Sequence, residues 1–116
     1  MLLQTPSKIM LAMAPIDMRK SYQGLSVLVH NVLNQDPFSS MAFVFLNKRR
    51  DRLKILHWHI NGFCIFQKRL EKGLFLTADG SNNASCDLSI YQLQGFIQGI
   101  DWKKIPEPMP LSYSQL

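Results

Sequence analysis

Residues 53–70 read LKILHWHINGFCIFQKRL, a run of strand-forming side chains interrupted once, at Asn61-Gly62. Asn-Gly between two such runs is the strongest short-range signal for a two-residue hairpin turn, in which both turn residues take positive φ angles. We therefore predict strands over 53–60 and 63–70, joined by Asn61-Gly62. We expect this hairpin to supply two strands of the sheet to which the flanking segments add.

The predicted turn also sets the register of the two strands. With Ile60 opposite Phe63, Trp58 faces Ile65 on the side expected to reach the core. Aromatic rings such as those of Trp58, Phe63 and Phe66 can stack on nucleic-acid bases, but in a small hairpin they more often form the core, and we expect Trp58 to be buried. The other face carries a possible metal-ligand set, His57, His59 and Cys64. We interpret this set as incidental, since a tetrahedral zinc site needs a fourth partner and a supporting shell.

The flanking sequence predicts two helices and two further strands. Strands are expected over 7–14, ended by Pro15, and over 41–46. A helix before Asp36-Pro37 is indicated by apolar residues at helical spacing, namely Leu25, Leu28, Val29, Val32 and Leu33. Asp17 or Ser21 is expected to cap it.

The C-terminal part predicts a loop over 77–87 and then a second helix, which begins with a capping box from Ser89 to Gln92 and stops at Gly99. The expected fold class is α+β: an antiparallel sheet of about four strands with two main helices on one face. One domain should span residues 1–105, followed by an extended Pro-rich tail over 106–116.

Charge is concentrated in one part of the chain. Between Lys48 and Lys72 there are eight Lys or Arg residues against two acids, a net of +6, while the remainder carries a net of −1. Such a concentration is typical of a surface that binds a polyanion, above all nucleic acid. The alternative is a solvated strand edge, since edge strands often carry Lys to resist pairing. The candidate nucleic-acid-binding residues are Lys48, Arg49, Arg50, Arg52, Lys54, Lys68, Arg69 and Lys72.

Other classes of function have little support in the sequence. Cys64 and Cys86 have no metal or disulfide spacing. No apolar run approaches the roughly 18 residues of a membrane span. We therefore expect a cytoplasmic protein with no membrane contact. No phosphate loop and no nucleophile signature is present, and the acids Asp17, Asp51 and Glu71 lie among cations as expected ion-pair partners. We therefore expect neither catalysis nor a bound cofactor or metal.

Several segments, in order, resemble one protein family. These are Asp17-Met18-Arg19-Lys20, Asp36-Pro37-Phe38, Phe43-Val44-Phe45, residues 47–54, Trp58, Gly62-Phe63 and Lys68-Arg69-Leu70-Glu71-Lys72-Gly73. From Ile9 to about Trp102 the chain resembles the TnpB-type accessory protein, the second open reading frame, of the insertion-sequence sixty-six family of bacterial transposons. It departs from the family pattern at Ser21, where glycine is usual, and at His59, where an acid is usual.

The resemblance implies a non-catalytic accessory factor for transposition, with the transposase of the same element as a partner. The residues add an expected mechanism, in which the basic hairpin holds the DNA backbone. Two alternatives remain open: a protein adaptor whose cations meet an acidic surface of the transposase, and a small metal-dependent hydrolase. Salt-dependent DNA binding would distinguish the DNA-binding factor from the protein adaptor, and metal bound at stoichiometry would favour the hydrolase.

Overall fold

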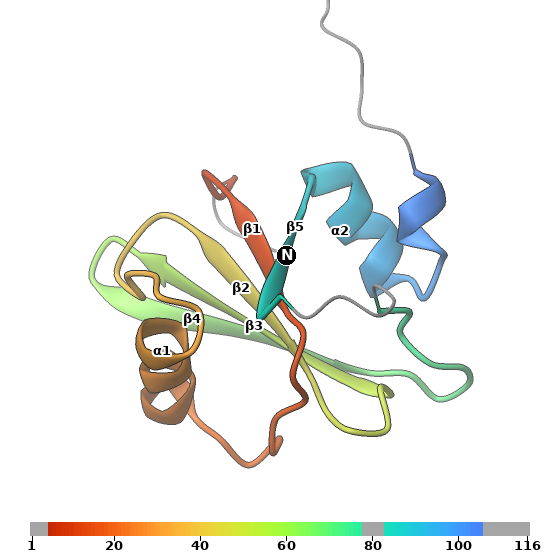
Figure 1. Cartoon of the computed structure of the whole chain (residues 1–116), viewed down its shortest axis with the longest axis horizontal. Helices are drawn as coiled ribbons and strands as arrows, with labels where there is room; N and C mark the ends of the chain where they lie inside the picture. The colour runs from red at the N-terminus through yellow and green to blue at the C-terminus, as the bar shows by residue number, and fades with distance from the viewer. Residues whose placement is uncertain (1–4, 78–82, 106–116) are drawn as a thin grey trace, which may run out of the picture.

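In the computed structural model, residues 5–77 and 83–105 are described, and they form a five-stranded sheet with two α-helices and one short 3₁₀ helix (Figure 1). The sheet order is β4-β3-β2-β1-β5. In chain order the elements are β1 (Ile9–Ala12), α1 (Tyr22–Asn31), β2 (Ala42–Leu46), β3 (Arg52–His59), β4 (Gly62–Arg69), β5 (Ser85–Leu88), α2 (Ile90–Ile97) and η1 (Trp102–Lys104). This confirms the α+β class, with one strand more than expected.

The additional strand, β5, begins within the predicted loop over 77–87 and extends one residue beyond it, to Leu88. It pairs antiparallel with β1, and Ile9 lies opposite Leu88. β1 also pairs with β2, in parallel, so the sheet is mixed rather than wholly antiparallel. The parallel pair is possible because the long connection between β1 and β2 contains α1, which crosses from one end of the sheet to the other.

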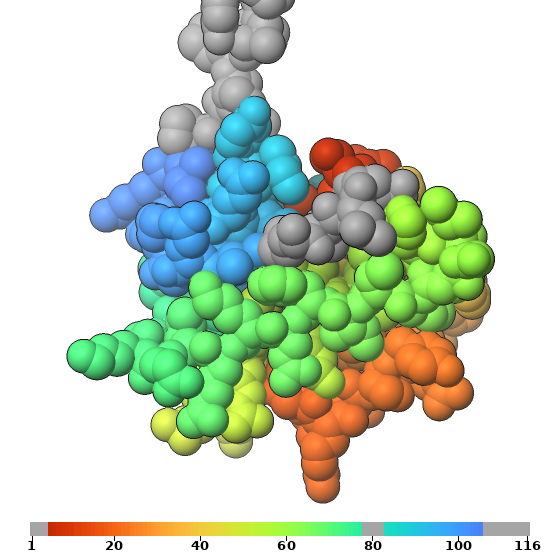
Figure 2. All heavy atoms as spheres, turned by 180° about the vertical axis from the view of Figure 1, so that it is seen from behind, coloured from red at the N-terminus to blue at the C-terminus, as the bar shows by residue number. Residues whose placement is uncertain are grey.

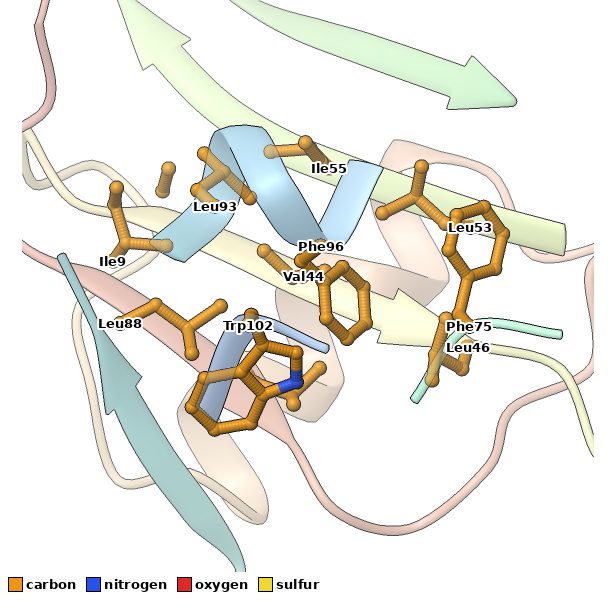
Figure 3. Close-up of a cluster of buried hydrophobic side chains, with 12 residues drawn as sticks. Ile9, Val44, Leu46, Leu53, Ile55, Phe75, Leu88, Leu93, Phe96 and Trp102 are labelled. Carbon is orange, nitrogen blue, oxygen red and sulfur yellow. The ribbon is translucent and has the colours of Figure 1, made fainter. Parts of the chain in front are cut away.

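The two helices cover opposite faces of the sheet, so the expectation that both lie on one face was wrong. Leu25 and Val29 of α1 pack in one cluster with Phe43 and Phe45, while Leu93 and Phe96 of α2 belong to another (Figures 1 and 3). Every residue of β2 is buried, which explains its unbroken apolar sequence AFVFL. A strand covered on both faces has no polar alternation.

The α2 face has the larger core (Figure 3). Phe96 stacks on Phe75 with ring centroids 5.5 Å apart, and Trp102 of η1 donates from Nε1 to the carbonyl of Leu76 at 2.7 Å. Both halves of the predicted capping box are present at the start of α2, where the Ser89 side chain accepts from the Gln92 backbone and the Gln92 side chain from Ser89. Gly99, with φ of +78°, follows the helix as predicted.

On the opposite face, α1 is shorter than the sequence predicted. It ends at Asn31, with Val32 as the C-cap, before the predicted stop at Asp36-Pro37. Leu25, Val29 and Leu33 are buried as expected, whereas Val32 is 44% exposed. Ser21 is the N-cap residue, but its side chain makes no capping hydrogen bond.

The β3–β4 hairpin forms, but its turn lies one residue earlier than predicted. Ile60 and Asn61 connect the strands, and Trp58 pairs with Phe63 rather than with Ile65. Ile60 carries the positive φ, at 57°, and Gly62 has no positive φ. This register brings the Trp58 and Phe63 rings to 5.0 Å, so packing outweighs the turn preference of Asn-Gly.

The tail over 106–116 lies outside the described residues. Among residues 5–77 and 83–105, no helix has the length and apolar character needed to cross a membrane.

Candidate nucleic-acid interface

The turn between β2 and β3 is held in a fixed shape by Asn47. Its side-chain oxygen accepts from the backbone N–H groups of Asp51 and Arg52 at 3.1 and 3.0 Å, and its amide donates to the Asp51 carboxylate at 2.6 Å. Arg50 completes the turn with a φ of 62°. The exposed side chains of Lys48, Arg49 and Arg50 therefore project from an ordered backbone.

The segment after β4 lies against this turn and adds further cations. Leu70 N–H donates to the Asp51 carbonyl at 2.8 Å, and Phe75 N–H donates to the Arg50 carbonyl at 2.7 Å. In Figure 2 the two segments lie together at the lower left of the molecule. We name this surface the basic end, and its residues are Lys48, Arg49, Arg50, Arg52, Arg69 and Lys72.

Two arginines of the basic end lie directly opposite each other on neighbouring strands. Arg52 of β3 pairs with Arg69 of β4, so both side chains leave the same face of the sheet. Like charges in this position repel. Among residues 5–77 and 83–105 the ion pairs are Lys8–Asp87 and Arg19–Asp17, and neither includes a cation of the basic end. An anion bound between Arg52 and Arg69 would relieve this repulsion.

The acids expected to pair with these cations behave differently from one another. Asp17 does form the predicted ion pair: its carboxylate accepts from the Arg19 guanidinium at 2.6–3.1 Å. These hydrogen bonds lower the pKa of Asp17 to about 2. Asp51 instead accepts from Asn47, which lowers its pKa, with Arg49 and Arg52 nearby as further causes. In the described part of the chain Glu71 has no ion pair, so the expectation of a partner for it was wrong.

The structure gives Lys54 and Lys68 roles inside the fold. Lys54 is only 7% exposed, and its ammonium donates to the carbonyls of Met18 and Lys20 at 2.6 and 2.7 Å. Lys68 points to the other face and donates to the Ile97 carbonyl at 2.9 Å, at the C-terminal end of α2. Cations at this end of a helix satisfy carbonyls that have no partner within the helix. Neither lysine is therefore part of the basic end.

At the other end of the hairpin, four aromatic rings form a partly exposed cluster. We name it the aromatic cluster, and its residues are Tyr22, Phe38, Trp58 and Phe63. Together with Gly62 they line a surface hollow. Trp58 is half-buried and belongs to neither core cluster, so its expected place in the core was wrong. Phe66 lies on the opposite face, against the α2 core.

Sequence reasoning missed Tyr22 and Phe38, which are distant in sequence from the hairpin. A signal was present for Tyr22, because it lies three residues before Leu25 and seven before Val29, on the same side of α1 as these buried residues. Tyr22 is 48% exposed and Phe38 is 58% exposed. Large apolar side chains gathered at such exposure are typical of contact surfaces.

The three candidate metal ligands do not form a joint site. His57 is 1% exposed, and its Nδ1 lies 3.3 Å from the Met41 carbonyl oxygen. Its buried Nε2 has no hydrogen-bond partner in the part of the chain that the structure describes. Cys64 lies opposite His57 on β4. Within the described ranges, no group of three or more His, Cys, Asp or Glu side chains is arranged to hold a metal ion.

Comparisons with known proteins give a family match over most of the chain. The family described as IS66 Orf2 like protein matches residues 7–107. The uncharacterized protein y4jC of Sinorhizobium fredii (strain NBRC 101917 / NGR234) is 34% identical over 98 residues, which cover 84% of this chain and 83% of the relative. The uncharacterized protein y4hO of the same strain is 31% identical over 96 residues, which cover 83% of each chain. No solved structure matches significantly.

Proposed function

The chain belongs to the family of IS66 Orf2-like proteins, and from this membership we propose that it is a non-catalytic accessory factor in transposition that binds DNA through its basic end. The match over residues 7–107 includes every residue of the basic end. As part of this proposal, the protein acts on bacterial DNA in the cytoplasm.

The observation that carries the DNA contact is the arginine pair of Arg52 and Arg69. The two lie opposite each other where the β2–β3 turn leads into β3, and this turn presents three more cations. Within residues 5–77 and 83–105, no carboxylate forms an ion pair with either arginine. The charges of this pair oppose folding, because like charges directly opposite each other on neighbouring strands repel. Guanidinium groups bind phosphate oxygens in bidentate fashion, and each neutralised phosphate releases counterions.

The contact we propose is with the backbone rather than with base edges of a duplex. The two α-helices within the described residues carry few cations: α1 contains His30 and no Lys or Arg, and α2 contains no basic residue. Neither is suited to enter a major groove as a recognition helix. Backbone contacts position a protein without reading the sequence.

The test is DNA affinity across a range of salt concentrations, for the wild type and for a variant with Arg49, Arg50 and Arg52 changed to Gln. We expect weaker binding by the variant and a flatter salt dependence, by up to about 0.9 in slope for each lost contact. Because these side chains are exposed or half-buried, each change should alter the free energy of unfolding by no more than about 0.5 kcal/mol.

The alternative, a protein adaptor, predicts a different outcome from the same variant. In that case the wild type binds DNA weakly at every salt concentration, and the triple change instead abolishes association with the transposase. Unchanged DNA affinity in a folded triple variant would contradict the proposed contact.

A further inference from the structure

We propose that the preferred ligand is DNA with unpaired nucleotides, whose bases stack on the aromatic cluster while the adjoining phosphates bind the basic end. The inference rests on the proposed function and names the form of DNA that the same surface accepts. It begins from the position of the two features, which lie at opposite ends of one hairpin face.

The two surfaces are joined by the outer face of β4. Phe63, Ile65, Gln67 and Arg69 alternate along the strand and so point to the same side. β4 is an edge strand, and Ile65, Gln67 and Arg69 are all exposed. Six residues of strand span about 20 Å, enough for a few nucleotides of an extended single strand. In Figure 2, β4 crosses the front of the molecule from the hairpin tip to the segment after residue 70.

The aromatic cluster offers ring surfaces to a ligand. Tyr22 stacks on Phe63 at 5.7 Å, and Phe38 meets Trp58 edge-on at 5.0 Å. Three separate segments contribute these rings: the start of α1, the loop before β2 and the hairpin itself. About half of the Tyr22 and Phe38 side chains remains exposed, at 48% and 58%.

The charge of the basic end and the apolar rings of the aromatic cluster together indicate which form of DNA fits this surface. The hollow at the aromatic cluster has no charged side chain among its lining residues, while the other end of the strip carries Arg52 and Arg69. A single strand supplies both flat apolar faces and a regular row of phosphates. A duplex supplies only the phosphates, since its base faces are stacked on one another. A surface with aromatic rings at one end and guanidinium groups at the other therefore fits unpaired DNA better than duplex DNA.

The test compares three ligands: an oligothymidylate of roughly 15 nucleotides, an abasic oligonucleotide of equal length, and a duplex. The variants are Phe38→Ala and Tyr22→Ala, and the matched control is Tyr91→Ala, because Tyr91 is 50% exposed on α2, across the sheet. We expect the wild type to bind the oligothymidylate most tightly. Each cluster variant should lose roughly 5- to 150-fold for that ligand, with unchanged affinity for the abasic strand and an unchanged salt slope. Tyr91→Ala should bind all three ligands as the wild type does.

The outcomes separate this inference from the proposed function. Equal affinity for the oligothymidylate and the abasic strand, with no loss in either cluster variant, would overturn base stacking and leave the backbone contact standing. An absence of salt-dependent binding to all three ligands would overturn both. If the cluster variants lose self-association or transposase binding while their DNA affinity is unchanged, the cluster is a protein-docking surface and the inference fails.

Discussion

Ile60 adopts a left-handed backbone conformation that β-branched residues rarely occupy, with a φ of 57° and 78% of its surface exposed. Replacing it with glycine removes that strain, which exceeds the entropy cost of glycine. We expect Ile60→Gly to raise the free energy of unfolding by about 0.5–1 kcal/mol, measured by urea denaturation.

A suitable control for this change is Ile65→Gly, because Ile65 lies in β4 without a positive φ and is 39% exposed. Glycine within a strand weakens it, so the control should be less stable than the wild type. A loss of stability in both variants would show that Ile60 is not strained.

Gly62 lies next to the same turn and shows how the shifted register changes the role of a residue. The sequence predicts a positive φ for Gly62 as a turn residue, a conformation in which a valine would destabilise the fold. In the structure Gly62 is the first residue of β4, and a Cβ at this position would meet no atom within 4 Å. The expectation was therefore wrong, and valine suits the strand conformation that Gly62 adopts.

Lys54 is a buried cation whose role is structural. Its ammonium is the hydrogen-bond donor for the carbonyls of Met18 and Lys20, which belong to the loop before α1. Lys54→Met keeps the apolar stem but leaves both carbonyls without this donor, and we expect a loss of about 1–3 kcal/mol in the free energy of unfolding.

The matched control is Arg69→Met, which changes an exposed cation on the same face of the hairpin. It should alter stability by no more than about 0.5 kcal/mol, while weakening DNA binding. The proposed assignment of the two cations is contradicted if Lys54→Met weakens DNA binding with no loss of stability.

Among the elements, α2 depends most on local chemistry. It has only eight residues, and isolated helices of that length are marginal in water. Ser89→Ala removes one half of the capping box and should cost about 1 kcal/mol in the free energy of unfolding, measured by thermal or urea denaturation.

Ser21 provides the control for this prediction within the same protein. It occupies the N-cap position of α1, but its side chain makes no capping hydrogen bond. Ser21→Ala should therefore be close to neutral. Equal losses from the two serine variants would mean that the capping hydrogen bonds of Ser89 contribute no stability.

The elements that sequence could predict are those whose signal is local. β1, β2, β3, β4 and both helices lie where apolar runs, helical spacing or a capping box predict them. β5 has the sequence SCDL, which has no strand pattern, and it becomes a strand through pairing with β1. The unbroken apolar run of β2 is a local signal for helices on opposite faces, because a strand covered on both faces has no polar alternation.

The candidate site likewise has one part that local sequence predicts and another that depends on tertiary packing. The basic end was predictable because its cations lie within 25 residues of sequence, from Lys48 to Lys72. Sequence could not show that Lys54 binds carbonyls 34 and 36 residues earlier, or that Lys68 reaches α2. Tyr22 and Phe38 join the hairpin only through tertiary packing.

At the scale of the whole molecule, the central claim is that DNA binds at one place, not merely through a net charge of +5. Two variants with equal loss of charge separate these possibilities. One changes Arg52 and Arg69 to Gln at the basic end; the other changes Lys103 and Lys104 to Gln in η1, which contacts α2.

The measurement that tests this most directly is the affinity of both variants for DNA across salt. We predict that the arginine variant binds more weakly and loses up to about 1.8 in salt slope, about 0.9 for each phosphate contact, while the lysine variant stays close to the wild type. Equal losses in the two variants would contradict the account, because binding would then follow net charge instead of the geometry of the basic end.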